Sequence, residues 1–271
     1  MPRQSTTNIS GRTIDSGFSV SGNGPAVVLL HSSLSAGTQW LALVKKLNPH
    51  FLSINIDLLG YGGAPPVSCP DDFQLLSEVE RIMAIINHQI GDANFSIIGH
   101  SYGGAVGLRL AYELKARVSA MVLYEPVAFH LLDQQSAGYA EIIEVSEPLA
   151  GYTSRQGAQR FVDYWNGDGF FGRLPGKVQQ LFSDKMAKVL LDFKALITEP
   201  CTITDYQFAN CPILLMQGQS SRLSAQSLAE ALARQLVNVT HHVFAGGHMA
   251  PVSDSEAVAE IMAGYLRRQG V

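Results

Sequence analysis

Short, mainly apolar runs alternate along the chain with segments in which apolar residues recur every three or four positions. Six runs predict β-strands: residues 26–30, 52–56, 95–98, 118–125, 212–218 and 239–244. The first of these is unbroken, which is typical of a strand buried on both faces of a parallel sheet. The helical spacing between the runs, for example at Leu75, Val79 and Ile82, predicts right-handed strand–helix–strand units. Weak alternation over residues 12–21 predicts an opening pair of short antiparallel strands.

This alternation of strands and helices stops at Pro126 and resumes only after Asn210. The stretch between them predicts several helices and no strong strand, and it is rich in aromatic residues. We therefore predict a single α/β core formed by residues 1–126 and 210–271, with residues 127–209 inserted as a helical cap.

A Gly-x-Ser-x-Gly sequence lies between one of the predicted strands and a helix-compatible segment. This strand–turn–helix context is what the nucleophile-elbow motif requires. The turn strains the backbone of its serine, and Gly99 and Gly103 remove the Cβ atoms that would collide there. The hydroxyl of Ser101 is then exposed beyond the sheet, above a helix N-terminus that favours developing negative charge. The alternative is a glycine-rich turn with an ordinary helix-capping serine.

The composition excludes several classes of function. The 271 residues are 46% hydrophobic and 15% charged, as in a folded enzyme with a full core. A net charge of −4 without a lysine/arginine cluster argues against a nucleic-acid partner. Three scattered cysteines, a polar N-terminus and the lack of a membrane-spanning run predict a cytoplasmic protein with no membrane partner. Dinucleotide, P-loop and zinc motifs are absent, so we expect no cofactor and no metal.

In the order of these features, the chain resembles the α/β-hydrolase fold family over nearly its whole length. The shared features are the strand ending in His31, the loop after Asp57, the elbow at Ser101, the cap and the Gly-Gly-His sequence that ends at His248. The resemblance implies an eight-stranded, mostly parallel sheet flanked by helices, and a serine–acid–histidine triad in that chain order. His248 matches the catalytic histidine, which takes the serine proton and returns it to the leaving group.

The acid of the triad departs from the family's usual pattern. That acid lies about three residues past the glycine that here is Gly218, yet the next four residues contain no carboxylate. Haloalkane dehalogenases of this family instead place it after the preceding strand, where this chain has Glu125. We therefore predict that Glu125 orients His248 and stabilises its charged form; the alternative is a carboxylate that caps the start of the insertion. Asp205 is the reserve candidate, whereas Asp57 ends a strand too far away.

An oxyanion hole needs two backbone N–H groups aimed at the tetrahedral oxygen. By position in the family, these come from Tyr102 and Ser33. Family members commonly read His-Gly-x where this chain reads His31-Ser32-Ser33, and serine at position 32 restricts the backbone. The alternative for both serines is a local polar turn. We expect His31 and His100 to be structural.

Serine at the elbow decides the expected reaction. Dehalogenases and epoxide hydrolases of this fold carry aspartate there, whereas serine forms an acyl-enzyme that water splits. We therefore expect a serine hydrolase acting on a small, largely apolar carboxylic ester or a related acyl substrate such as a lactone. Carbon–carbon hydrolases of ring-fission products and perhydrolases share the layout and remain alternatives. A ligand receptor or scaffold that has lost turnover is the alternative outside enzymes.

Overall fold

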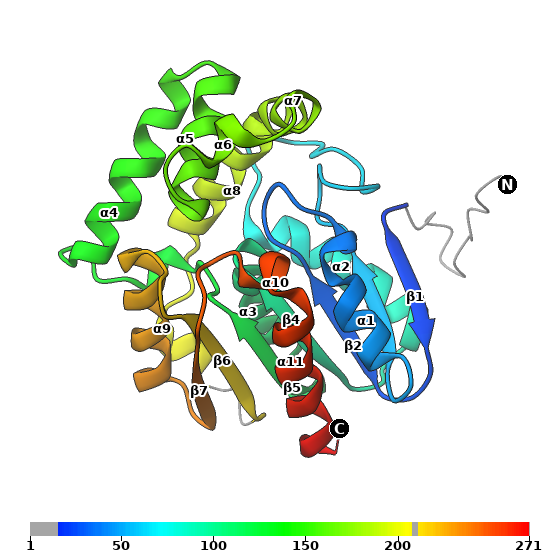
Figure 1. Ribbon diagram of the computed structural model, residues 1–271. Helices are drawn as coiled ribbons and strands as arrows, with labels where there is room; N and C mark the ends of the chain where they lie inside the picture. Colours follow the sequence, from blue (N-terminus) through cyan, green and yellow to red (C-terminus); the bar gives the residue numbers. More distant parts are fainter. Residues whose placement is uncertain (1–15, 208–210, 271) are drawn as a thin grey trace, which may run out of the picture.

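The computed structural model describes residues 16–207 and 211–270, which form one seven-stranded sheet with helices on both sides (Figure 1). The strands are β1 (Phe18–Gly22), β2 (Ala26–Leu30), β3 (Leu52–Ile56), β4 (Phe95–His100), β5 (Val118–Tyr124), β6 (Ile213–Gly218) and β7 (Val239–Phe244). Their order in the sheet is β1-β3-β2-β4-β5-β6-β7. β1 runs antiparallel to β3, and the other pairs are parallel.

The strands predicted between residues 26 and 244 are all confirmed. The resemblance implies eight strands, and the described part of the chain forms seven. Of the predicted opening pair over residues 12–21, β1 is present, while residues 12–15 lie outside the described residues.

Each face of the sheet is covered by its own set of helices. The helices of the core are α1 (Leu41–Leu47), α2 (Leu75–Ile90), α3 (Tyr102–Leu114), α9 (Leu223–Gln235), α10 (Ala250–Ser253) and α11 (Ser255–Gln269). Val28 and Leu30 of β2 pack into the apolar core with α2, α3 and α9. Val27 and Leu29 of the same strand pack on the opposite face with α1 and α11. Because successive strand residues point to opposite faces and both faces are buried, β2 is apolar throughout.

The predicted insertion between β5 and β6 is helical, and its described residues contain no strand. Its helices are α4 (Ala137–Ser146), α5 (Ser154–Asn166), α6 (Phe170–Arg173), α7 (Gly176–Asp184) and α8 (Met186–Thr198). α4 packs against α9 of the core. The remaining helices of the insertion, α5 to α8, are called the helical insert below. Figure 1 shows these helices grouped at the upper left, outside the layers that cover the sheet. Among the helices in the described residues, none is long and apolar enough to cross a bilayer.

The turn from β4 into α3 requires glycine because other backbone passes too close for a side chain. A Cβ atom on Gly103 would lie 2.3 Å from the carbonyl oxygen of Leu30 and 2.4 Å from that of His31. A Cβ on Gly99 would lie 2.6 Å from the carbonyl oxygen of Gly103. The glycines therefore let α3 begin directly against the end of β2, as the elbow motif predicts.

We predict that Gly103→Ala destabilises the fold by about 1–3 kcal/mol, because two backbone carbonyls must move to admit the methyl group. Gly172→Ala is the matched control, because a Cβ there meets nothing within 4 Å and Gly172 lies in helix α6. The control should be neutral or stabilising by up to about 1 kcal/mol. Urea unfolding of the two variants measures both effects, and equal stabilities would contradict this account of the turn.

Candidate active site

Ser101 lies between the last residue of β4 and the first residue of α3, in a backbone conformation that side chains rarely adopt. Its φ is 54° and its ψ is −122°. Its N–H donates to the carbonyl of Tyr124 at 3.0 Å, and its carbonyl accepts from Gly104 and Ala105 at the start of α3. These bonds hold the strained turn in place. The side chain is thereby fixed at the end of the sheet, with 6% of the residue exposed.

The imidazole of His248 lies between Ser101 and Glu125. His248 follows β7, and its Nε2 is 2.9 Å from the Ser101 Oγ. Its Nδ1 is 2.7 Å from the Glu125 Oε2. A carboxylate can only accept, so Nδ1 carries the proton and Nε2 accepts from the serine hydroxyl. The structure thus brings together the three residues that the sequence proposes as a triad.

Glu125 immediately follows β5, the strand next to β4, and its backbone is also strained, with a φ of 41°. Its N–H donates to the carbonyl of Met216 at 2.9 Å, which extends the pairing of β5 with β6. Its second carboxylate oxygen accepts from the N–H of Gly218 at 2.6 Å. Both oxygens are therefore bonded in a residue that is 1% exposed, which fixes the direction of the carboxylate toward His248.

The other two carboxylates considered from the sequence have different partners. Asp57 accepts from the N–H groups of Gly37 at 2.6 Å and Gly63 at 2.7 Å. It follows β3 and therefore links loops near the β1 edge of the sheet, on the opposite side from β7. Asp205 accepts from both the N–H and the hydroxyl of Thr202 at 2.7 Å in a local cap.

His100 holds the backbone of His248 in place through a hydrogen bond. Its Nε2 lies 2.8 Å from the carbonyl of His248, and its Nδ1 lies 3.1 Å from the side-chain amide of Gln39. The amide oxygen of Gln39 accepts from the Ser32 hydroxyl at 2.9 Å. Because the amide N–H needs an acceptor, Nδ1 is unprotonated and Nε2–H donates to His248. Burial, reinforced by the charge of His248, lowers the pKa of His100 well below its usual value.

His31 has an equivalent structural role at the end of β2. Its Nε2 accepts the N–H of Leu58 at 2.9 Å, and its Nδ1 lies 2.7 Å from the carbonyl of Ser32. Burial lowers the pKa of His31 to about 4, against a smaller opposing effect of the Ser32 carbonyl. His31 is therefore neutral at physiological pH, and both of its ring nitrogens are used by the backbone.

The two residues expected to form an oxyanion hole both lie close to Ser101. Tyr102 is the first residue of α3, where a backbone N–H has no acceptor within the helix. Ser33 follows β2 and lines the same small cavity as Ser101. Leu34, the next residue, has a φ of 58°, so this loop is strained as the elbow is.

The cavity beside Ser101 is small, and most of the residues that line it are apolar. It is lined by Ser33, Ser101, Val127, Phe129, Phe161, Trp165, Val189, Asp192, Phe193 and Leu196. The space available to the centre of a water-sized sphere is about 10 Å³, roughly the room of one water molecule. The indole of Trp165, from α5, stacks on the His248 imidazole with 3.8 Å between ring centroids and 26° between planes. Side chains of the helical insert therefore line the cavity, and one of them covers the ring of His248.

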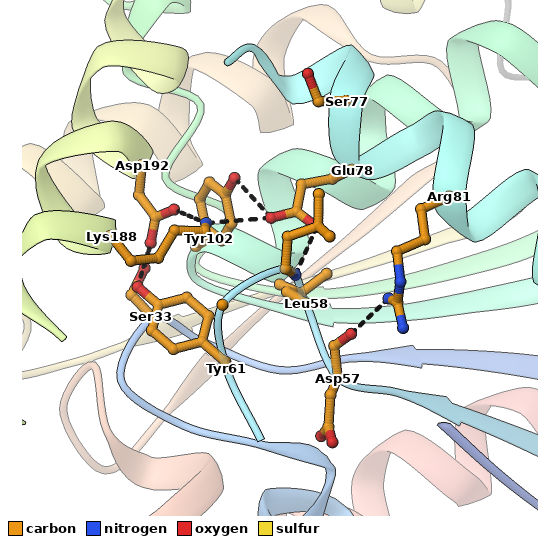
Figure 2. Close-up of polar contacts among 12 residues, drawn as sticks. Ser33, Asp57, Leu58, Tyr61, Ser77, Glu78, Arg81, Tyr102, Lys188 and Asp192 are labelled. Atoms are coloured by element: carbon orange, nitrogen blue, oxygen red, sulfur yellow. Dashed lines mark hydrogen bonds and ion pairs between the residues drawn. The ribbon is translucent and has the colours of Figure 1, made fainter. Parts of the chain in front are cut away.

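A buried charged cluster lies beside this cavity, and Figure 2 shows its members converging from the core and the insert. Lys188 of α8 forms an ion pair with Asp192, four residues along the same helix. Its Nζ also lies 3.1 Å from an oxygen of Glu78 in α2. The oxygen of Asp192 that faces the core accepts from the hydroxyls of Tyr61 at 2.5 Å and Ser33 at 2.7 Å.

Neither this cluster nor Trp165 is marked out as functional by the sequence pattern. The available signal is the spacing of Lys188 and Asp192, which puts opposite charges on a helix face that is otherwise formed by apolar residues such as Val189 and Leu196. Such a pair on a buried face has to be satisfied by groups elsewhere, but the sequence does not say which. Within the described residues, no group of three or more potential ligands is arranged to hold a metal ion.

A model of the Alpha/beta hydrolase family matches residues 27–261. The chain belongs to this family. Solved structures similar to this hydrolase include a thermophilic esterase from Thermogutta terrifontis, with a TM-score of 0.76, 22% identity and 98% of each chain covered. The enol-lactonase from Burkholderia xenovorans LB400 has a TM-score of 0.75 and 16% identity, covering 92% of this chain and 95% of that chain. At these identities the similarity establishes the fold.

Among curated relatives, the lipase LipV of Mycobacterium tuberculosis is 34% identical over 105 residues, which is 38% of each chain. The matched regions span only 30% to 45% of the length of the curated relatives. These partial matches leave the reaction and the substrate of this hydrolase to be inferred from its own site.

We predict that the fold loses stability as the pH falls from about 6.5 toward 4, because His31 in the unfolded chain takes up a proton that the folded chain excludes. Between about pH 7.5 and about pH 5, His31 alone should lower the unfolding free energy by about 2 kcal/mol. Urea unfolding at the two pH values measures this change.

The His31→Gln variant removes the titrating group and should show a weaker pH dependence than the wild type. His50 is exposed, so His50→Gln serves as the control and should leave the pH dependence unchanged. Equal wild-type stability at the two pH values would contradict a neutral, buried His31.

Proposed function

We propose that this hydrolase cleaves a small, uncharged carboxylic ester through an acyl-enzyme on Ser101. The observation that carries the proposal is the continuous chain of hydrogen bonds from Ser101 through His248 to Glu125. It provides a nucleophile, a base within reach of its proton, and a buried carboxylate that fixes the tautomer of the base. The esterase and lipase among the similar proteins support the same class of reaction.

In the proposed reaction, the Ser101 oxygen attacks the carbonyl carbon of the ester while His248 Nε2 takes the serine proton. Glu125 and the face of Trp165 both stabilise the imidazolium that forms, the first by its charge and the second by a cation–π contact. The carbonyl oxygen becomes an oxyanion that accepts from the N–H groups of Ser33 and Tyr102. His248 then protonates the leaving alcohol, and a water activated by the same base releases the acid.

The residues that line the cavity favour an uncharged acyl group, and the cavity has to widen to admit one. Its polar side chains are Ser33, Ser101 and Asp192, and the hydroxyls of the two serines already donate to other residues. Lys188, the nearest cation in the described cluster, is held by Asp192 and Glu78. A carboxylate on the acyl group would therefore enter a mainly apolar cavity whose side chains offer it no free donor, which costs several kcal/mol.

The same argument separates the ester hydrolase from a carbon–carbon hydrolase of ring-fission products. A ring-fission dienoate carries a carboxylate close to the reacting carbonyl, and the cavity offers no cation to receive it. Serine at position 101 also separates the protein from its haloalkane dehalogenase relative, because the alkyl-ester intermediate of that fold needs an aspartate.

The three cysteines are all unpaired, which supports the reducing, cytoplasmic setting expected from the sequence.

We predict that a fluorophosphonate probe labels the wild type stoichiometrically at Ser101 and fails to label Ser101→Ala. Mass spectrometry of the labelled peptide measures this effect. An unlabelled, stably folded wild type would favour the receptor alternative.

We predict that Glu125→Gln lowers kcat on a p-nitrophenyl ester by about 10³- to 10⁴-fold with the fold intact, because it favours the wrong histidine tautomer. Steady-state kinetics measure this effect. A near-wild-type rate for Glu125→Gln would refute the proposed role of Glu125.

We predict that ethyl butanoate is hydrolysed with a kcat/KM at least about 10²-fold higher than that of monoethyl succinate. The two esters are matched in chain length and differ by a terminal methyl group against a carboxylate. A pH-stat assay measures both, with alkaline hydrolysis of each ester as the chemical control. Comparable values, or turnover of a ring-fission dienoate, would contradict the uncharged acyl pocket.

A further inference from the structure

The hydroxyl of Ser33 connects the proposed oxyanion hole to the helical insert. Ser33 lines the cavity with Ser101, and its Oγ donates to Asp192 of α8 at 2.7 Å. The two residues are 159 positions apart in the chain. Figure 2 shows Ser33 and Asp192 facing each other across the boundary between the loop after β2 and helix α8.

The loop that carries Ser33 needs an external support. Leu34 has a positive φ, and a strained backbone persists only where its surroundings determine it. Ser32 is held by Gln39 on one side, through its N–H at 3.2 Å and its hydroxyl at 2.9 Å. On the other side, the side chain of Ser33 is held by Asp192. An N–H donor acts in catalysis only when it is fixed within a few tenths of an ångström of the oxyanion position.

Asp192 is itself held rigidly, so it can serve as a fixed anchor. It is 2% exposed, and its partners besides Ser33 are the Tyr61 hydroxyl and the Lys188 ammonium. Lys188 is in turn anchored by Glu78 and enclosed by three aromatic rings, at 4.5 to 4.9 Å from their centroids. Burial raises the pKa of Tyr61 well above its usual value, so its hydroxyl stays protonated and donates to Asp192.

We propose that Asp192 is a positioning residue for the oxyanion hole, acting through its hydrogen bond to the Ser33 hydroxyl. This inference rests on the proposed serine-hydrolase function. It assigns a role to a carboxylate that does not touch the triad, and it makes the hole depend on the helical insert as well as on the core. The competing view is that the Asp192 cluster only stabilises the packing of α8 on the core.

Two substitutions separate these views. Ser33→Ala removes the hydroxyl that bonds to Asp192 and keeps the backbone N–H. Glu78→Gln removes a charge from the same cluster, on the side where Glu78 contacts Lys188, and leaves both partners of the Ser33–Asp192 bond unchanged. If Asp192 positions the hole, Ser33→Ala lowers kcat by about tenfold or more with little change in KM, while Glu78→Gln keeps kcat within about twofold.

The affinity for a trifluoromethyl ketone gives a readout that a packing role would not change. Ser101 adds to the ketone carbon, its proton passes to His248, and the carbonyl oxygen becomes the bound oxyanion. The inhibition constant should rise in Ser33→Ala by the same factor as kcat falls, and it should stay unchanged in Glu78→Gln. Thermal unfolding of both variants measures the loss of stability separately.

Asp192→Asn completes the comparison, because Asp192 and Ser33 in one bond should give effects that do not multiply. The double variant should be no slower than the slower single variant. If Asp192→Asn does not fold, the comparison of Ser33→Ala with Glu78→Gln decides. An active wild type whose Ser33→Ala variant keeps kcat and inhibitor affinity overturns this inference alone. A wild type that is neither labelled at Ser101 nor active on esters overturns the proposed function and this inference with it.

Discussion

The hydrogen bond between Glu125 and His248 is the interaction on which the site depends. It spans 123 positions in the chain and is buried, with 0% and 2% of the two side chains exposed. Its existence follows from the order of the strands. β4 and β5 are parallel neighbours, so Ser101 and Glu125 emerge at the same edge of the sheet. The N–H of Ser101 bonds to the carbonyl before Glu125, which locks the two strained turns to each other. His248 completes the arrangement from the loop after β7.

With the proposed acid, Glu125, placed after β5, the loop after β6 has a different role. Gly218 donates its N–H to Glu125, and the residues that follow it support the histidine loop. Gln219 donates to the carbonyl of Phe244 at 2.8 Å, and Ser220 donates to that of Gly246 at 2.9 Å. A Cβ on Gly218 would lie 2.8 Å from the Gly246 carbonyl, so only glycine lets the two loops approach. The segment where the family's usual acid stands here supports, through its backbone, both Glu125 and the loop of His248, the proposed acid and base.

The parts of the site that lie close together in the sequence could be predicted, and the parts that depend on packing could not. The turn at Ser101 is encoded by five consecutive residues, and its glycines are required because neighbouring backbone leaves no room for a Cβ atom. Glu125 could be proposed because no carboxylate follows Gly218 and the family offers a second position. The bond of Ser33 to Asp192 and the stacking of Trp165 on His248 join the core to the helical insert. Such contacts depend on how two helical layers meet, which the spacing of apolar residues along one helix does not specify.

The most direct test of this account is the protonation of the two ring nitrogens of His248 in the free enzyme at neutral pH. Nitrogen-15 NMR of protein labelled at histidine distinguishes a proton on Nδ1 from a proton on Nε2, and a His248→Ala variant assigns the signals. The account predicts a proton on Nδ1, strongly deshielded by its bond to the Glu125 carboxylate, with Nε2 free to accept from Ser101. A proton on Nε2 would leave the serine without a base and would contradict the arrangement from which the proposed chemistry follows.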